Sequence, residues 1–136
     1  MKNLRATAVV VRNNTILMIH RYREGTEYFV LPGGHIEEET PEEAVIRELK
    51  EETSISANLD SKITEIIDEE GRKHIFFKCE YVSGEPRLDE KSSENKRMNE
   101  NNQYLPKWIE LSKISSITIW PEEAKEFLIK YLQNNF

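Results

Sequence analysis

Three glutamates in the first half of the chain have the spacing of a shared helix edge. Glu48, Glu51 and Glu52 are related as i, i+3 and i+4 within residues 40–53, a segment that favours a helix. At about 100° per residue their carboxylates fall along one edge of that helix, beside its apolar face. Carboxylates at these spacings repel one another by roughly 0.2–0.5 kcal/mol per pair, and a divalent cation removes this repulsion. Because oxygen ligands favour hard ions, the spacing points to Mg²⁺ or Mn²⁺.

A solvated helix face is the more common explanation for such a cluster. Residues 37–52 contain eight glutamates against Arg47 and Lys50, so this stretch has a net charge of −6. The whole chain of 136 residues also has a formal net charge of −6, so the remainder is neutral. Concentrated like charge is unfavourable unless a counter-charge neutralises it. The residues in front of the helix distinguish the two interpretations.

The predicted helix follows a strand and a glycine turn. Residues 28–31 have the pattern of a short strand, which the Pro-Gly-Gly at residues 32–34 ends abruptly. Thr40 is a typical N-cap, Pro41 suits the first helical position, and Glu43 completes a capping box with Thr40. The three glutamates therefore lie in the second half of a helix with a well-defined start.

Apolar periodicity elsewhere predicts one mixed α and β domain over residues 1–136, with five or six strands and two substantial helices. Predicted strands cover residues 5–12, 16–19, 28–31, 63–68, 74–82 and 107–111, and a last helix begins at Pro121. Alternation along residues 74–82 places Cys79 on one face with Ile75, Phe77 and Tyr81, which predicts a packed thiol without a catalytic role. The polar residues 89–103 predict a long surface loop.

Composition excludes several classes of protein. The chain is 38% hydrophobic and 32% charged, which suffices for one core and differs from a disordered chain. No apolar run approaches the ~20 residues of a membrane span, and the first residues lack a signal-peptide core. One cysteine excludes an internal disulfide, and the negative charge argues against nucleic acid. We therefore expect a soluble cytoplasmic protein with neither a membrane nor a nucleic-acid partner.

The glycine turn and the helix together resemble the signature of the Nudix hydrolases. Gly33 is followed by five residues, Glu39, seven residues, Arg47-Glu48-Leu49-Lys50-Glu51-Glu52 and Thr53-Ser54-Ile55. The family signature is Gly, five residues, Glu, seven residues, then Arg-Glu-aliphatic-any-Glu-Glu-any-Gly-aliphatic. Ser54 stands where the closing glycine is usual, and only four residues separate Gly34 from Glu39. The resemblance implies the family's α/β/α sandwich with a mixed β-sheet.

The resemblance also implies an activity. In this family the signature is called the Nudix box, and its helix, here residues 40–53, is the box helix. The box helix binds divalent cations, here Mg²⁺ or Mn²⁺, which bind a pyrophosphate and activate a water for attack on phosphorus. The implied substrate is a small molecule, a nucleoside diphosphate linked to another group, with a nucleoside triphosphate favoured. ADP-ribose, oxidised dGTP and dinucleoside polyphosphates stay open, and a homodimer is a further expectation from relatives.

Matching positions carry the family roles to particular residues. The implied metal ligands are Glu48, Glu51, Glu52, the backbone carbonyl of Gly33 or Gly34, and a distal carboxylate, for which Glu94 is preferred over Glu90 and Glu100. Glu51 and Glu52 are the expected catalytic residues, with Glu51 either a ligand to an additional ion or the general base.

Other residues are expected to bind substrate or support the box. Arg21, Arg23 and His35 are expected to bind phosphates, and the alternative for each is an ordinary surface residue. Arg47 is expected to point away from Glu48 and to orient a box carboxylate, and Glu39 is expected to pair with Arg47 or to accept hydrogen bonds from loop amides. Trp120 and Tyr104 either stack a nucleobase or simply pack.

Two other functions compete with hydrolysis. A Nudix-fold protein can bind a nucleotide without turnover, although degenerate members of that kind lose box glutamates, and Glu48, Glu51 and Glu52 are all present here. An acidic interaction module without a site would not require Gly33, Gly34 and Arg47 at these spacings. Release of phosphate or pyrophosphate from a nucleotide panel, with and without Mg²⁺, separates the three.

Overall fold

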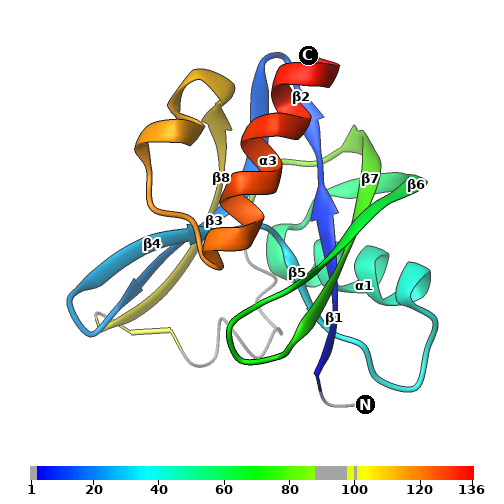
Figure 1. The fold of residues 1–136 in the computed structure, drawn as a ribbon, viewed down its shortest axis with the longest axis horizontal. Coiled ribbons are helices and arrows are strands. Elements are labelled where there is room, and N and C mark those ends of the chain that lie inside the picture. The colour runs from blue at the N-terminus through cyan, green and yellow to red at the C-terminus, as the bar shows by residue number, and fades with distance from the viewer. Residues whose placement is uncertain (1–2, 88–97, 100) are drawn as a thin grey trace.

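The computed structural model describes residues 3–87, 98–99 and 101–136, which form two four-stranded sheets (Figure 1). The first sheet has the order β5-β1-β7-β6, with β5 at Gly33–His35, β1 at Leu4–Val9, β7 at Lys73–Ser83 and β6 at Ser56–Ile67. Strand β1 is antiparallel to β5 and parallel to β7, so this sheet is mixed.

The second sheet is antiparallel throughout. Its strands are β2 (Val11–Arg12), β3 (Thr15–Arg23), β4 (Thr26–Val30) and β8 (Asn102–Glu110), and β3 pairs with the other three. Asn13 and Asn14 join β2 to β3 with φ of 51° and 63°, the left-handed conformation that two-residue hairpin turns require. Asparagine tolerates this conformation better than most residues do.

Two helices cover opposite faces of the first sheet. Helix α1 (Pro41–Thr53) packs Val45 and Leu49 into one core cluster, which includes Phe77 and Cys79 of β7. Helix α3 (Glu122–Asn135), which follows the 3-10 helix η1 (Leu111–Ser116), packs Leu128 into a second cluster with Phe76 of β7. Since Phe76 and Phe77 point to opposite faces of the same strand, the two clusters sandwich the sheet. The predicted α/β/α sandwich is confirmed.

The strand limits differ from the sequence prediction where polarity or backbone breaks hide the pattern. The predicted strand 5–12 is interrupted at Val10, which separates β1 from β2. Strand β6 begins at Ser56, well before the predicted residue 63, because residues 58–62 are exposed on an edge strand and need no apolar alternation. Strand β8 begins at Asn102 and includes Pro106, which an edge strand accommodates because one side of its backbone lacks a strand partner.

Cys79 is 2% exposed in the first core cluster, as the alternation of β7 predicts. Burial raises the pKa of this thiol to about 12, so it is a packed, protonated side chain. In the part of the chain that the structure describes, no helix is long and apolar enough to cross a membrane.

Candidate functional site

Both ends of α1 are held by specific caps. The Glu43 amide donates to Oγ1 of Thr40 at 3.1 Å, and the Thr40 amide donates to the Glu43 carboxylate at 3.0 Å. This is the predicted capping box, and it fixes the start of α1. Gly33 and Gly34, which were predicted to break the preceding strand, themselves begin strand β5. At the other end Ser54 has a φ of 63°, its amide donates to the Lys50 carbonyl at 2.9 Å, and its hydroxyl donates to the Arg87 carbonyl at 2.8 Å. Serine therefore adopts the left-handed conformation that the family assigns to glycine.

The second half of α1 lies directly against the two glycines of β5. The Gly33 amide donates to Oε1 of Glu52 at 2.7 Å, and Glu52 is only 8% exposed. A Cβ atom built on Gly34 would lie 1.6 Å from Oε2 of Glu48. The absence of a side chain at Gly34 is therefore what allows the Glu48 carboxylate to reach this position.

Arg47 binds the neighbouring carboxylates from the helix edge. Its Nε and Nη2 donate to the two oxygens of Glu39 at 3.1 and 2.6 Å, and its Nη1 donates to Glu48 at 3.1 Å and Glu51 at 2.9 Å. The predicted pairing of Glu39 with Arg47 is confirmed. The expectation that Arg47 points away from Glu48 is wrong, because the long side chain folds along the helix edge and reaches both neighbours. The bond from Arg47 lowers the pKa of the Glu39 carboxyl.

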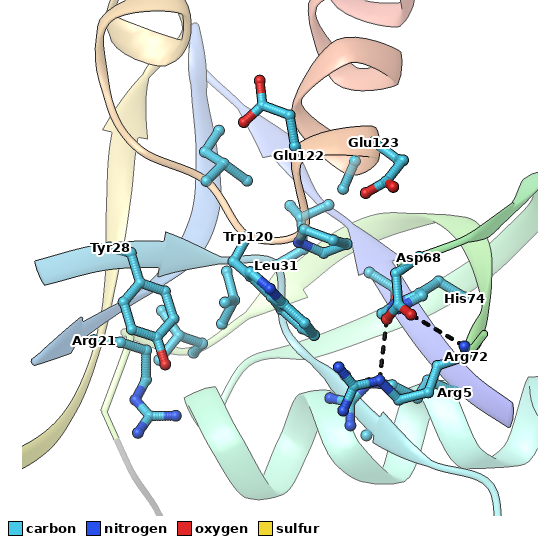
Figure 2. A pocket seen from close by; sticks show the side chains of 18 of the residues that line it. Arg5, Arg21, Tyr28, Leu31, Asp68, Arg72, His74, Trp120, Glu122 and Glu123 are labelled. Carbon is cyan, nitrogen blue, oxygen red and sulfur yellow. Dashed lines mark hydrogen bonds and ion pairs between the residues drawn. The ribbon is translucent and has the colours of Figure 1, made fainter. Parts of the chain in front are cut away.

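A cavity of about 940 Å³ opens beside Glu48 and Glu52, and Figure 2 shows residues from other parts of its wall. Glu48, Glu52, Gly33 and Gly34 line one part of it. The same cavity is lined by the residues predicted to bind phosphates, Arg21, Arg23 and His35. The structure thus brings two of the three box glutamates and these three cationic or ionisable side chains to one cavity.

The predicted substrate residues have partners of their own. Arg21 donates to Oδ1 of Asn102 at 2.8 Å and to the Gln103 carbonyl at 3.2 Å, and its guanidinium lies 3.7 Å from the ring centroid of Tyr104. Nε2 of His35 lies 3.5 Å from Nη1 of Arg5 on the neighbouring strand. Their role in binding substrate stays a prediction.

Glu51 is placed differently from Glu48 and Glu52. It pairs with Arg47, its side chain is 43% exposed, and the residues lining the cavity do not include it. Glu94, Glu90 and Glu100 lie outside the described residues. Within residues 3–87, 98–99 and 101–136, no three histidine, cysteine, aspartate or glutamate side chains are grouped closely enough to hold a metal ion. The metal and catalytic assignments of these glutamates and of Gly33 stay predictions.

The donors at the cavity wall nevertheless have the chemistry that a hard divalent ion requires. Glu48 and Glu52 offer carboxylate oxygens, and they stand against a glycine backbone where a Cβ atom would collide with Glu48. Oxygen ligands from carboxylates and backbone carbonyls are those that Mg²⁺ and Mn²⁺ select. These residues therefore fit the cation that the sequence implies.

Sequence reasoning missed a group of residues on another part of the cavity wall. Asp68 directly follows β6, Arg72 directly precedes β7, and His74 is the second residue of β7, with Arg5 beside it on β1. All four line the cavity together with Trp120 (Figure 2). The short connection between the predicted strands 63–68 and 74–82 was a usable signal, because it brings the ends of both strands to one place. The parallel pairing that places Arg5 beside His74 was not evident from either segment alone.

Comparisons with known proteins agree with the fold and the box. The family model described as NUDIX domain matches residues 2–131. An ADP-ribose pyrophosphatase of Methanocaldococcus jannaschii is 34% identical over 106 residues, which cover 73% of this chain and 62% of that protein. The chain thus spans less than two thirds of the length of this relative.

Solved structures share the architecture at lower identity. A NUDIX-family hydrolase from Clostridium perfringens superimposes with a TM-score of 0.73 and 18% identity, covering 100% of this chain and 99% of the other. A MutT NUDIX hydrolase from Burkholderia pseudomallei gives a TM-score of 0.61 and 24% identity, covering 96% and 97%. The family model extends over nearly the whole chain and includes the glycine turn and the glutamate helix, so this chain belongs to the NUDIX hydrolase family.

Proposed function

We propose that this chain hydrolyses a pyrophosphate bond in a nucleoside diphosphate linked to another group, with Mg²⁺ or Mn²⁺ as the cofactor. The observation that carries the proposal is the approach of Glu48 and Glu52 to the Gly33–Gly34 backbone at the wall of a cavity. A bound divalent ion would neutralise phosphate charge and lower the pKa of a coordinated water. Glu48 and Glu52 are the residues that would hold this ion.

Hydrogen bonds within the chain orient the carboxylates at this part of the cavity wall. The Gly33 amide donates to Oε1 of Glu52 and so fixes the orientation of this carboxylate at the cavity wall. Arg47 donates to Oε1 of Glu48, so both carboxylates have a fixed orientation before any substrate arrives. Glu51, which also contacts Arg47, is the proposed ligand of an additional ion or the proposed general base. Arg21 and Arg23 are proposed to bind the phosphates as counter-charges.

The identity of the nucleotide is a separate question. The archaeal relative carries the name ADP-ribose pyrophosphatase, which supports including ADP-ribose beside nucleoside triphosphates, oxidised dGTP and dinucleoside polyphosphates in a substrate panel. The cavity volume of about 940 Å³ lies at the upper end of the usual range for ligand pockets and does not by itself select one of them. A cytoplasmic location and a homodimer are proposals that the panel does not address.

Glu52→Gln tests the proposal most directly. This substitution keeps a hydrogen-bond acceptor for the Gly33 amide and removes the charge that a hard cation needs. We expect turnover to fall by two or more orders of magnitude, about 3 kcal/mol or more in the barrier. Glu42→Gln is the matched control, because Glu42 is exposed on the same helix and does not line the cavity.

The panel is run with and without Mg²⁺ and Mn²⁺, with phosphate and pyrophosphate release as the readout. Metal-dependent turnover by wild type and Glu42→Gln, but not by Glu52→Gln, supports the proposal. Metal-dependent nucleotide binding without turnover by wild type would favour the alternative of a binding protein. Equal turnover by Glu52→Gln and wild type would show that the metal assignment is wrong.

A further inference from the structure

Asp68 is a buried carboxylate that the proposed hydrolysis does not use. Its side chain is 2% exposed and lies just after β6, where the chain turns into β7. Oδ1 accepts the backbone amides of Glu70 at 2.9 Å and Arg72 at 3.0 Å. Oδ2 accepts Nε of Arg72 at 3.0 Å and Nε2 of His74 at 2.8 Å. One oxygen therefore holds the backbone turn, and the other holds two side chains.

This carboxylate is ionised despite its surroundings. Burial by itself would raise the pKa of Asp68, but hydrogen bonds from His74, from the Arg72 and Glu70 amides and from the Arg72 side chain outweigh burial and lower it. Burial lowers the pKa of His74, so its imidazole is neutral and donates through Nε2. Hydrogen bonds to a buried charge are strong and directional, so the positions of Arg72 and His74 are well defined.

Arg72 and His74 in turn contact Trp120. The Arg72 guanidinium carbon lies 4.9 Å from the indole centroid, over the ring, and a further ion pair joins Arg72 to Glu70. The His74 ring meets the indole edge-on, with centroids 6.0 Å apart and planes at 69°. Figure 2 shows the indole projecting into the cavity on the same side as Arg72 and His74. Trp120 is still 40% exposed and lines the cavity, so much of its ring is available to a ligand.

We propose that Asp68 is a positioning residue that, through Arg72 and His74, holds the Trp120 indole as a stacking surface for a planar aromatic ring. On the proposed function, on which this inference rests, that ring is the nucleobase of the substrate. A base stacks on an aromatic side chain regardless of its hydrogen-bonding edge, so the surface supplies affinity for the nucleoside end. Because the indole is already held, ring binding does not have to immobilise a mobile side chain.

Asp68→Asn distinguishes a role of Asp68 in positioning Arg72 and His74 from a role of its negative charge alone. The asparagine carbonyl can replace Oδ1 as acceptor for the two backbone amides, whereas its NH₂ group cannot accept from Arg72 and His74. If Asp68 acted only through its charge, its loss would make the cavity more positive and would strengthen the binding of every anion. The positioning role instead predicts weaker binding of ligands that carry a ring, and of those alone.

The experiment compares AMP with ribose 5-phosphate, which lacks the ring, without any divalent metal. Calorimetry or tryptophan fluorescence gives Kd for wild type, Asp68→Asn, Trp120→Leu and the matched control Asp60→Asn. Asp60 is an exposed carboxylate on β6, the strand that ends just before Asp68, and it does not line the cavity. We expect AMP to bind wild type more tightly than ribose 5-phosphate, and this advantage to fall about fivefold or more in Asp68→Asn and Trp120→Leu. Asp60→Asn should bind both as wild type does.

A spectroscopic readout reports on the indole itself. The Trp120 N–H resonance, assigned by its loss in Trp120→Leu, should shift on AMP addition and should be displaced or broadened in free Asp68→Asn. If Asp68→Asn does not fold, Arg72→Gln decides the matter, because it removes the guanidinium over the indole and leaves the Asp68–His74 bond intact. Normal AMP binding and an unchanged Trp120 resonance in the folded variant would overturn the proposal.

The result is independent of turnover. Ring-dependent and Asp68-dependent AMP binding in a chain that hydrolyses nothing would refute the proposed function and retain this inference. Equal affinities of wild type for AMP and ribose 5-phosphate would overturn the inference, even if the chain hydrolyses nucleotides.

Discussion

Gly34 and Glu48 approach each other so closely that a methyl group on Gly34 would lie 1.6 Å from Oε2 and 2.4 Å from Cδ of Glu48. The neighbouring glycine has a different restriction. A Cβ atom on Gly33 would lie 2.2 Å from the carbonyl oxygen of Ala6, which is backbone of the adjacent strand β1. A side chain can rotate away from a clash, whereas a paired strand cannot move without breaking its ladder. Gly34 therefore preserves the position of the Glu48 carboxylate, whereas Gly33 preserves the pairing of β5 with β1.

We predict that Gly34→Ala displaces Glu48 and lowers the affinity for Mn²⁺ by about tenfold or more, equivalent to about 1.4 kcal/mol. The free energy of unfolding should change little. Gly33→Ala, by contrast, should destabilise the fold by about 2 kcal/mol or more, because overpacking against backbone forces the strands apart. Calorimetric titration with Mn²⁺ and urea unfolding measure the two effects. Wild-type Mn²⁺ affinity in Gly34→Ala would contradict the role assigned to the contact.

Mn²⁺ should raise the Tm of the chain, and this increase should depend more on Glu48 and Glu52 than on Glu51. An ion at 100 times its Kd that binds only the folded state adds about 2.7 kcal/mol. Thermal melts should show this as a raised Tm for wild type and no response for the triple variant Glu48→Gln, Glu51→Gln, Glu52→Gln. Glu51→Gln alone should retain most of the response, because Glu51 is held by Arg47 outside the cavity lining. Equal responses of wild type and the triple variant would place the cation elsewhere.

Local signals in the sequence were sufficient for the box helix and insufficient for the rest of the cavity. Thr40, Pro41 and Glu43 define the helix start through contacts between near neighbours, so the sequence predicts it accurately. Glu48 and Glu52 follow from the same helix. The direction of Arg47 did not follow, because a flexible side chain chooses among several carboxylates within reach.

The Asp68 cluster depends on contacts between distant segments. Strand periodicity predicts where β7 lies, but not that Arg5 of β1 is its parallel neighbour at His74. Trp120 was a candidate for base stacking from its sequence position, whereas its contacts with Arg72 and His74 required the folded sheet. Exposed residues of β6 were missed because an edge strand can be polar on both faces.

Ser54 provides a test of the helix end. Its φ of 63° is unfavourable for residues with a branched Cβ, so Ser54→Val should destabilise the chain by about 1–2 kcal/mol. The free energy of unfolding of Ser54→Gly should stay within about 1 kcal/mol of wild type. Glycine adopts the left-handed conformation without strain, and this gain offsets the loss of the hydrogen bond to the Arg87 carbonyl and the greater conformational freedom of the unfolded chain. Ser56→Val, at an extended position two residues later, is the control. Urea unfolding measures all three, and a stable Ser54→Val would show that the turn is not left-handed.

The ionised Asp68 should make stability sensitive to acid. Its folded pKa lies below the unfolded value of about 3.9, so the folded state binds fewer protons than the unfolded state in this range. The stability from Asp68 is therefore complete above about pH 4 and is lost as the pH falls toward the folded pKa. Asp68→Asn lacks this contribution and should be less stable than wild type by about 1.5–3 kcal/mol at pH 5. In urea unfolding the gap should narrow as the pH falls below 4, and a constant gap would contradict the assignment.

The position of β1 between β5 and β7 has a consequence for synthesis of the chain. Arg5 is opposite His35 of β5 on one side and His74 of β7 on the other. Strand β1 is synthesised first, but it can complete its pairing only after β7, the last strand of this sheet in the sequence, has been made. A nascent chain that has emerged only as far as β6 leaves one edge of β1 without its partner, and open strand edges attract other chains. Contacts over such sequence separations also slow folding, because a long loop must close before they form. Full pairing of β1 therefore has to wait until residues 73–83 have been made.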